Sequence, residues 1–431
     1  MTGSFDRRQL LAGLGVTLAS LVLTRPAPAA PGLTLTAAAG ELPLPGSVKP
    51  TRTQCFDAST PGPLLHTKRN RAVKLRFANR LDAPSTIHWH GVRLANSMDG
   101  VPALTQQAVK PGEGFDYAFT PPDAGTFWYH PPAFGPFLSQ CEAGLYGVLI
   151  VDEDEPPKVD RDLVLVIDDW NIGADGQIQA TADSKPTITA NSKPAETISL
   201  APNERVRLRL VNAAATRIAK LALAGFPATI VAIDGHPVDT PFAPNHGRLD
   251  LPPGGRADIA VDGLLTTGSE AGIALDRDGD VVILAHLVSN GAAPLRPALL
   301  PPLVLPRPDL PAALALQKAK RVTLALSGRN GGGSVLPDKP LFSVKRGSLV
   351  DLGLANKTPI DQAVHVHGHA MRILHPFDDE WQPYWVDTVT IGPGETVHTV
   401  FTADNPGKWL LHGRACGPSR KDDLLTWFEV T

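Results

Sequence analysis

The sequence is short of cysteine, of charge and of long hydrophobic runs, and each shortage excludes a class of protein. Only 3 of the 431 residues are cysteines, too few for a disulfide-rich scaffold or a cysteine-rich zinc site. Charged residues make up 19% of the chain, less than long helical bundles and coiled coils need. The formal net charge of −3 argues against a nucleic-acid partner, because such a protein needs a basic surface. No segment reaches ~18 uninterrupted apolar residues, so we expect no membrane-spanning helix.

Glycine and proline are abundant instead. The chain has 39 glycines and 42 prolines, and 43% of its residues are hydrophobic, so it is expected to fold with many turns rather than to be disordered. Its length suits two to four domains. Composition therefore predicts an all-β, multidomain protein.

The first 30 residues have the features of an export signal and are set apart from the fold. Arg7 and Arg8 precede two leucines, a mild apolar run follows as far as Leu23, and small residues fill positions 27–30. The paired arginines are typical of a twin-arginine signal, with an ordinary secretory signal as the alternative. We expect a mature protein outside the cytoplasm, in the periplasm.

Three segments of the mature chain repeat one pattern. Residues 73–79, 206–212 and 350–356 alternate apolar and polar residues as half-buried strands do, and each segment ends on an asparagine. A Pro-Gly turn follows in each copy, at 111–112, 253–254 and 393–394. A period of roughly 140 residues indicates duplicated domains rather than a solenoid. We predict Greek-key sandwich or barrel domains at 31–153, 154–293 and 313–431, with a Pro-rich linker at 294–312.

Histidines occupy three matching positions in the first and third copies but not in the second. These positions hold His88, His90 and His130 in the first copy, His365, His367 and His412 in the third, and Leu221, Leu223 and Gly272 in the second. Both imidazoles of a His-x-His pair on a strand point to one face, so two copies can direct their histidines into one cavity. Because imidazole binds copper, zinc, iron or nickel, a metal site is favoured over isolated surface or core histidines.

Five motifs resemble those of the multicopper oxidases with three cupredoxin domains, the group of laccases and bacterial copper oxidases. They are His-Trp-His-Gly at 88–91, Trp-Tyr-His at 128–130, Gly-Leu-Tyr-Gly at 144–147, His-Val-His-Gly-His at 365–369 and Asp-Thr at 387–388. The resemblance implies three tandem cupredoxin-like domains and copper as the cofactor. It also implies that a reducing substrate is oxidised while dioxygen is reduced.

In that family a trinuclear copper cluster between the first and third domains reduces dioxygen. By position, its type 2 ligands fall on His88 and His365. Its six type 3 positions hold His90, His130, Pro132, His367, His412 and Arg414. Proline has no donor atom, and a protonated arginine repels a cation at ~4 Å by about 4 kcal/mol at an effective dielectric of ~20. The resemblance thus implies one to three copper ions in an incomplete cluster.

The type 1 copper site, which takes electrons from the substrate in that family, is lost. Its histidines fall on Gln362 and Pro418, its thiolate on Gly413 and its axial position near Asp423. A blue copper site requires the thiolate. Cys416 lies three residues further on, on the opposite face of a strand, and does not replace it. Ordinary laccase turnover is therefore not expected.

Asp99 falls on the proton-handling acid of the family, which makes it a candidate proton relay. The alternative is a turn residue before Gly100. A second acid of the family falls on Gly417 and is lost.

The other polar and aromatic residues have structural interpretations. The alternating Arg205, Arg207 and Arg209 are expected on the solvent face of a strand. Cys55 with Cys141 is one candidate disulfide. Three aromatic residues are expected to pack in the core or at an edge, with a substrate cleft as the alternative: Trp381, Tyr384 and Trp385. Histidines without a partner at ligand spacing are expected at the surface or in structural hydrogen bonds: His66, His236, His246, His286, His375 and His398.

Two functions of different classes are compatible with these residues. The first is an exported copper-binding oxidoreductase that uses dioxygen and an unknown reducing substrate. The second is a non-catalytic scaffold or cell-division protein of the same fold, with a protein of the cell envelope as its partner. Retention of six cluster histidines favours metal binding, because a scaffold has no need of them.

Overall fold

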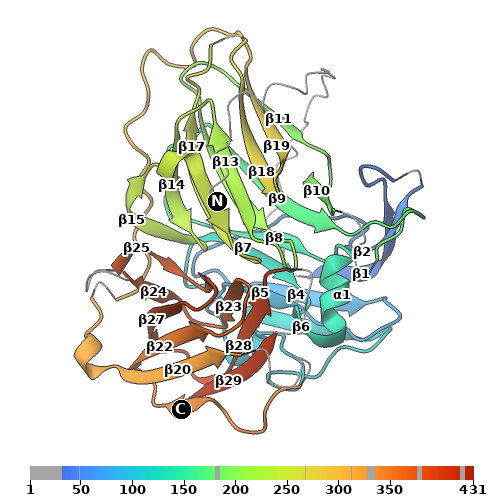
Figure 1. The fold of residues 1–431 in the computed structure, drawn as a ribbon, viewed down its shortest axis with the longest axis vertical. Coiled ribbons are helices and arrows are strands. Elements are labelled where there is room, and N and C mark those ends of the chain that lie inside the picture. The colour runs from blue at the N-terminus through green and yellow to red at the C-terminus, as the bar shows by residue number, and fades with distance from the viewer. Residues whose placement is uncertain are drawn as a thin grey trace.

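The fold is described by a computed structural model over residues 32–431, apart from 48, 180–184, 267, 312, 328–334, 376–380 and 418–422. The predicted export signal and Pro418 lie outside these residues. Six β-sheets provide nearly all of the regular structure (Figure 1). The all-β prediction is confirmed. Within the described ranges, no helix is long and apolar enough to cross a membrane.

The first two sheets contain four strands each, and the short helix α1 (Leu138–Glu142) lies beside them. One sheet has the order β2 (Thr51–Phe56), β1 (Leu33–Leu42), β4 (Val73–Asn79), β6 (Gly114–Phe119). The other has the order β3 (Leu65–Lys68), β8 (Gly147–Asp152), β7 (Gly125–His130), β5 (His88–His90).

The next two sheets follow in sequence. The six-stranded sheet has the order β10 (Thr187–Ala190), β9 (Arg161–Trp170), β12 (Arg205–Asn212), β17 (Arg256–Asp262), β14 (Ala228–Ile233), β15 (His236–Phe242). The five-stranded sheet has the order β11 (Glu196–Leu200), β19 (Asp280–Ser289), β18 (Ala271–Arg277), β13 (Ala219–Ala224), β16 (Arg248–Leu251).

The last two sheets contain five strands each. One has the order β20 (Lys320–Leu326), β22 (Ser348–Asn356), β27 (Thr396–Ala403), β24 (Met371–Leu374), β25 (Trp381–Val386). The other has the order β21 (Phe342–Val344), β29 (Leu424–Val430), β28 (Gly407–Ala415), β23 (Gln362–Val366), β26 (Thr388–Ile391).

The three equivalent strands expected from the repeat are present as β4, β12 and β22. Each ends on the predicted asparagine, whose side-chain amide donates to backbone carbonyls of neighbouring loops. The Pro-Gly turn of each copy returns to the same asparagine. Gly112, Gly254 and Gly394 donate their N–H groups to the carbonyls of Asn79, Asn212 and Asn356, respectively. The repeated Asn and Gly thus fasten one strand end to one turn in every copy.

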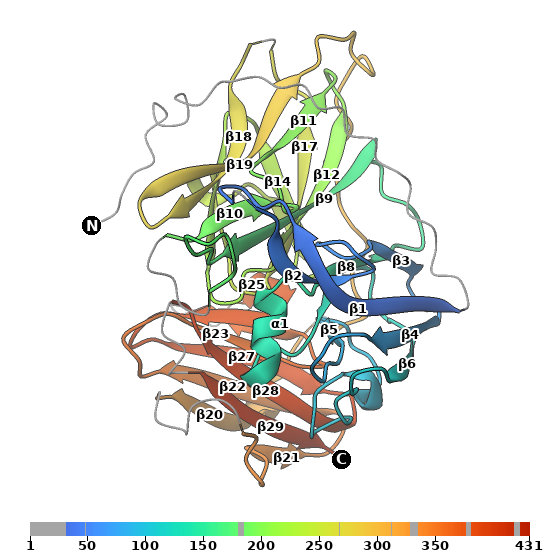
Figure 2. The same ribbon diagram turned by 90° about the vertical axis from the view of Figure 1, so that its right-hand side faces the viewer.

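The hydrophobic core explains which sheets meet. A single cluster of buried side chains runs through the first and third pairs of sheets, from Leu35 to Val430. The second pair has a separate core, built around Leu208 and Ile259. Figure 2 shows the first pair (blue to teal) beside the third (orange to red), with the second (green to yellow) above both. The shared core brings the histidines of the first and third copies together.

The prediction that the arginines of β12 face solvent is wrong. All eight residues of β12 are buried, because the face that carries the arginines is covered by residues of the first domain, among them Thr126 and Glu153. Arg207 bonds the carboxylates of Asp258 and Glu153, and Arg209 bonds Asp258 and Asp162. The alternating arginines of β12 therefore belong to a buried, charged interface between domains. Their burial is tolerated because each cation has carboxylate partners.

The candidate disulfide is not formed, since all three cysteines are free. The Cys55 sulfur lies 3.3 Å from the hydroxyl of Thr53, within the first domain. The Cys141 sulfur donates to the carbonyl of Pro131 at 3.0 Å, beside the ligand candidate His130. The two thiols therefore have separate partners.

Candidate metal centre

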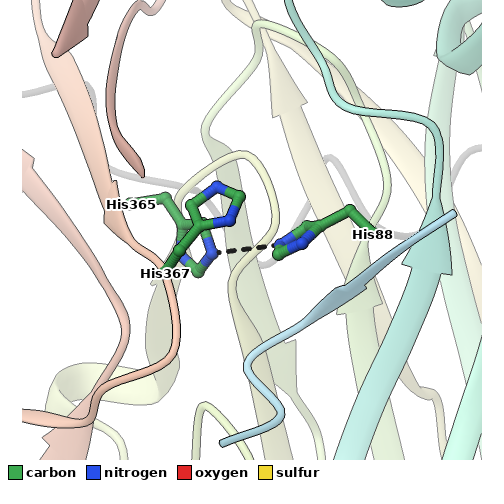
Figure 3. A group of neighbouring side chains, drawn as sticks. All are labelled: His88, His365 and His367. Atoms are coloured by element: carbon green, nitrogen blue, oxygen red, sulfur yellow. Dashed lines mark hydrogen bonds between the residues drawn. The ribbon is translucent and has the colours of Figure 1, made fainter. Parts of the chain in front are cut away.

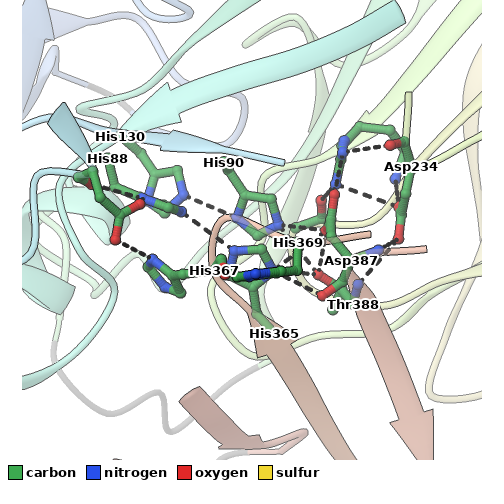
Figure 4. A network of polar contacts seen from close by, with 12 residues as sticks. His88, His90, His130, Asp234, His365, His367, His369, Asp387 and Thr388 are labelled. Atoms are coloured by element: carbon green, nitrogen blue, oxygen red, sulfur yellow. Dashed lines mark hydrogen bonds and ion pairs between the residues drawn. The ribbon is translucent and has the colours of Figure 1, made fainter. Parts of the chain in front are cut away.

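Two pairs of antiparallel strands present the predicted histidines. On β5 and β7, His88 lies directly opposite His130. On β23 and β28, His365 lies directly opposite His412. His90 follows His88 by two residues on β5, so period-2 alternation returns it to the same side. His367 directly follows the end of β23 and lines the same cavity as His365. Figure 4 shows five of these six rings converging between the first and third domains.

All six predicted histidines line one small cavity of about 30 Å³. All six are buried, with exposed fractions of at most 7%. The walls are completed mainly by Trp128, Phe134, Thr388, Pro132 and Arg414. The cavity is about the size that one water molecule occupies in the liquid. It therefore suits small ions rather than an organic substrate.

The first pair of facing nitrogens joins the two domains. The Nε2 atoms of His88 and His365 lie 3.3 Å apart (Figure 3). His88 Nδ1 faces the carbonyl of Asp99 at 3.0 Å, and His365 Nδ1 faces the carbonyl of Asp387 at 3.0 Å. A carbonyl only accepts, so each Nδ1 carries the hydrogen and each Nε2 of the neutral ring carries a lone pair. Two lone pairs thus face each other, which is unfavourable unless a cation lies between them.

In a second pair of nitrogens, two lone pairs again face each other. His90 Nδ1 lies 3.3 Å from His130 Nε2. His130 Nδ1 donates to the carbonyl of Pro131 at 2.6 Å, while His90 Nε2 donates to the carboxylate of Asp387 at 3.1 Å. The remaining nitrogens, which face each other, are again both lone-pair acceptors. This arrangement provides a second position for a cation.

Asp99 holds two of the rings from the first domain. Its carboxylate lies 3.0 Å from His367 Nδ1 and 3.2 Å from His88 Nδ1. Burial opposes its ionisation, but interactions with His367 and His88 outweigh burial and lower the pKa of Asp99. Both rings are therefore held with the hydrogen on Nδ1 and the lone pair on Nε2.

His412 has no hydrogen-bond partner for its Nε2 among the described residues, although the ring is buried. The ring packs edge-on against Phe134. Burial, reinforced by the nearby Arg414 charge, lowers the pKa of His412. A neutral buried imidazole with an unused nitrogen at the cavity is a ready metal ligand.

The donor set fits metal ions. Three groups have ligand atoms within 4.8 Å of one another: His88, His365 and His367; His88, His90 and His130; and His90, His365 and Asp387. Two nitrogens that bind one ion at ~2.0 Å with a tetrahedral angle lie ~3.3 Å apart. The two facing pairs have this separation. Imidazole-rich sites of this kind suit copper among other transition metals.

Pro132 and Arg414, which the family resemblance aligns with two further histidines, line the same cavity. The Arg414 guanidinium is tied to backbone carbonyls: it donates to Ala133 of the first domain at 2.9 Å and to Ala215 of the second. Two of its N–H groups thereby join the domains, and the protonated guanidinium offers no lone pair to a metal ion.

The residues that the family resemblance aligns with a type 1 copper site form a packed structure. The Gln362 amide nitrogen donates to the hydroxyl of Thr358 at 3.1 Å. A Cβ added at Gly413 would lie 3.1 Å from the Leu326 side chain and 3.3 Å from that of Leu424. Cys416 follows the end of β28, and its sulfur contacts the carbonyl of Arg414. Nothing described at these positions combines a thiolate with imidazoles.

Other predicted residues have varied surroundings. His66 and His398 lie beside the carboxylates of Asp152 and Asp351, at 3.5 and 2.9 Å, as expected for structural histidines. His236 differs, because it is fully buried and neither ring nitrogen has a described partner. Tyr384 lines a larger cavity of about 600 Å³ between the second and third domains, which shares Thr388 with the histidine cavity.

Residues around the histidines were not assigned a role by sequence reasoning. Asp387 and Thr388 were noted only as a motif, yet their side chains contact His90. Arg256 and Asp234, from the second domain, bind Asp387 in turn. No spacing rule connects these positions, because they meet only where three domains join.

The fold and site together define a three-domain β-sandwich protein with an imidazole cluster between its first and third domains. Family models described as multicopper oxidase match residues 41–156, 161–265 and 306–415. The chain belongs to the multicopper oxidase family. The predictions of that family and of cupredoxin-like domains are confirmed.

Solved structures and curated relatives agree with this assignment. Lac15 from a marine microbial metagenome is 34% identical, with a TM-score of 0.79 over 93% of this chain and 100% of that one. A multicopper oxidase from Pseudomonas thermotolerans is 31% identical, with a TM-score of 0.81 over 93% and 99%. Multicopper oxidase MmcO of Mycobacterium tuberculosis is 27% identical over 88% of this chain and 83% of its own length. Copper resistance protein A of Pseudomonas syringae is 39% identical over 30% of this chain, but that match spans only 21% of its own length.

The buried neutral rings make the metal-free protein sensitive to acid. Burial and the neighbouring His88 lower the pKa of His367 to about 3, whereas an unfolded histidine titrates near 6.5. Below pH 6.5 the unfolded chain therefore binds more protons than the folded one, and stability falls with pH. At pH 5 one such ring lowers the free energy of unfolding by about 2 kcal/mol. Urea denaturation of metal-free protein at pH 7 and pH 5 measures this, and equal midpoints would contradict it.

Proposed function

We propose that this protein binds copper through His88, His90, His130, His365, His367 and His412, as one to three ions of the type 2 and type 3 kind, without a type 1 ion. Two contacts carry the proposal. His88 Nε2 faces His365 Nε2, and His90 Nδ1 faces His130 Nε2, each across 3.3 Å and each with a lone pair on both nitrogens. The other nitrogen of each ring donates a hydrogen bond to an oxygen, which fixes the tautomer of that ring. The repulsion between the two facing lone pairs is then relieved by a cation between them.

Copper bound there would supply one-electron exchange with dioxygen. The protein's own residues orient the rings around a cavity of about 30 Å³. The carboxylate of Asp99 holds protons at Nδ1 of His88 and His367, and this contact supports a role for Asp99 as the proton relay of the site. Substrate electrons have no collection site at Gln362 and Gly413. We therefore propose oxidoreductase chemistry that depends on an unidentified reducing substrate and is not ordinary laccase turnover.

Export is part of the same proposal. The paired arginines at positions 7 and 8 and the small residues at 27–30 support passage to the periplasm by the twin-arginine route. The domain boundaries proposed are 31–153, 154–293 and 313–431, after a signal at 1–30 and with a linker at 294–312. A non-catalytic role in the cell envelope, with a protein partner, is the outcome if the purified protein binds no copper.

Replacing both His88 and His365 by Ala should lower bound copper by at least one equivalent per chain. These rings supply both nitrogens of the facing pair that joins the domains. Elemental analysis after copper reconstitution and removal of loose metal measures the change. The matched control replaces His66 and His398, two histidines that lie beside the carboxylates of Asp152 and Asp351 and do not line the histidine cavity. Unchanged copper in the His88/His365 variant would place the metal elsewhere and refute the proposal.

A further inference from the structure

The second domain has no histidine at the ligand positions, yet one of its arginines contacts a carboxylate that holds a ring of the cluster. Arg256 is the first residue of β17 and is fully buried. We propose that Arg256 is a positioning residue of the metal centre, which acts through Asp387 to decide which ring nitrogen of His90 is free for a metal ion. This inference rests on the proposed copper site and adds the second domain to it.

Every N–H of the Arg256 guanidinium has an acceptor. A guanidinium has five N–H donors in a rigid plane. Two of them form a fork on the Asp387 carboxylate of the third domain, at 2.9 and 2.6 Å. The other three bond the backbone carbonyls of Thr126 in the first domain and of Gly254 and Asp234 in the second. The side chain is thus fixed at the point where the three domains meet.

The fork fixes the Asp387 carboxylate in one orientation. Its Oδ1 accepts from Arg256 at 2.9 Å, from the Thr388 hydroxyl at 2.8 Å and from His90 Nε2 at 3.1 Å. Asp234 holds the same segment by its backbone, because its Oδ2 accepts the N–H groups of Asp387 and Thr388. Arg256 and Asp234 therefore hold both the side chain and the main chain of Asp387.

The consequence is the tautomer of His90. A carboxylate can only accept, so His90 keeps its hydrogen on Nε2 and its lone pair on Nδ1, toward His130. A carboxylate free to rotate would leave the Thr388 hydroxyl as the alternative partner of Nε2, at 3.2 Å. A hydroxyl can donate as well as accept, so it does not fix the tautomer.

The turn before Arg256 restricts the same ring by contact. Gly254 has a φ of +86°, and a Cβ there would lie 2.6 Å from Cε1 of His90. Only glycine permits this approach in a left-handed conformation. The Pro-Gly turn and the arginine two residues later thus fix the position and the protonated nitrogen of one ligand. Partners of metal-binding histidines act in this way, and their loss lowers metal affinity about 10–100-fold.

The test compares Arg256→Met, Arg256→Lys and Arg207→Met with the wild type as full-length protein. Long-range ¹H–¹⁵N correlation of metal-free, ¹⁵N-histidine-labelled protein reads the tautomer of His90, assigned with a His90→Gln variant. We expect a uniform Nε2–H form in the wild type and mixed tautomers in Arg256→Met. Copper titration should show affinity lowered about 10–100-fold in Arg256→Met. Arg256→Lys keeps the charge but loses the fork, so it should lie between the two.

Arg207→Met is the matched control, because Arg207 is an equally buried arginine of the same domain that bonds Asp258 and Glu153 but none of the ligand histidines. It should retain the wild-type tautomer despite its lower stability. A uniform His90 tautomer in Arg256→Met, or mixed tautomers in Arg207→Met, would overturn the inference. If Arg256→Met does not fold, a uniform tautomer in Arg256→Lys overturns it equally. Absence of copper binding by the wild type would refute the proposed function while leaving the tautomer result decisive for Arg256.

Discussion

Copper-loaded wild-type protein is expected to take up dioxygen with phenols or diamines no faster than buffer containing the same free copper. Reduction of dioxygen to water needs four electrons, and a chain of this family collects them at a type 1 site. The family resemblance aligns Gln362 and Gly413 with two positions of that site, and neither residue supplies an imidazole or a thiolate. An oxygen electrode measures uptake, and an absorption spectrum of the same sample should lack the intense blue band of a copper–thiolate.

Two sets of substitutions test separately the type 1 positions and the two cluster positions without histidine. Gln362→His, Gly413→Cys and Pro418→His restore the type 1 ligands, but a Cβ at Gly413 must displace the Leu326 or Leu424 side chain slightly. Uptake by this triple variant should remain low, because Pro132 and Arg414 still interrupt the cluster.

Adding Pro132→His and Arg414→His supplies the missing ligands. The same change leaves the carbonyls of Ala133 and Ala215 without the Arg414 donor, so a loss of stability should accompany it. Uptake should rise above background only in this quintuple variant at equal copper occupancy. Rapid dioxygen uptake by the wild type would contradict this prediction. It would show that the protein is an ordinary oxidase whose electrons reach the cluster without passing through the type 1 positions.

The fold was predictable because local signals and the repeat agree. Alternating segments ending on Asn79, Asn212 and Asn356 correspond to real strands, and the Pro-Gly turns bind those asparagines. The cavity-lining histidines were also predictable, since strand alternation alone puts His88 and His90 on one side. Their equivalent positions in two copies then implied one shared cavity.

Burial of charge and contacts between domains were not predictable. The alternation of Arg205, Arg207 and Arg209 has the period of a solvent-exposed face, and only the packing of the first domain and the linker over that face shows otherwise. Arg256 and Asp387 are far apart in sequence and belong to different domains. Pairing them requires the packing of three domains, which no local pattern encodes.

The buried arginines of β12 lead to the largest expected change in stability. Arg207 is fully buried and lies between two carboxylates, Asp258 at 2.6 Å and Glu153 at 2.7 Å. Asp258 is shared with Arg209 at 3.3 Å and accepts the Thr126 hydroxyl of the first domain at 2.7 Å. Removing the central cation leaves two buried carboxylates short of a partner, away from water.

Arg207→Met should therefore lower the free energy of unfolding by about 3–5 kcal/mol, as for other buried ion pairs that lose one partner. Urea denaturation of metal-free protein at pH 7 gives the difference. Arg217→Met is the control, because Arg217 is partly exposed and pairs with Asp169 and Asp278 at 3.2 and 3.1 Å; its loss should be within about 1 kcal/mol. In the double variant Arg207→Met/Glu153→Gln the loss should be smaller than the sum of the single losses, because the neutral amide removes the carboxylate that Arg207→Met leaves unpaired. Additive losses, or an Arg207→Met effect no larger than that of Arg217→Met, would show that solvent or other donors satisfy these carboxylates.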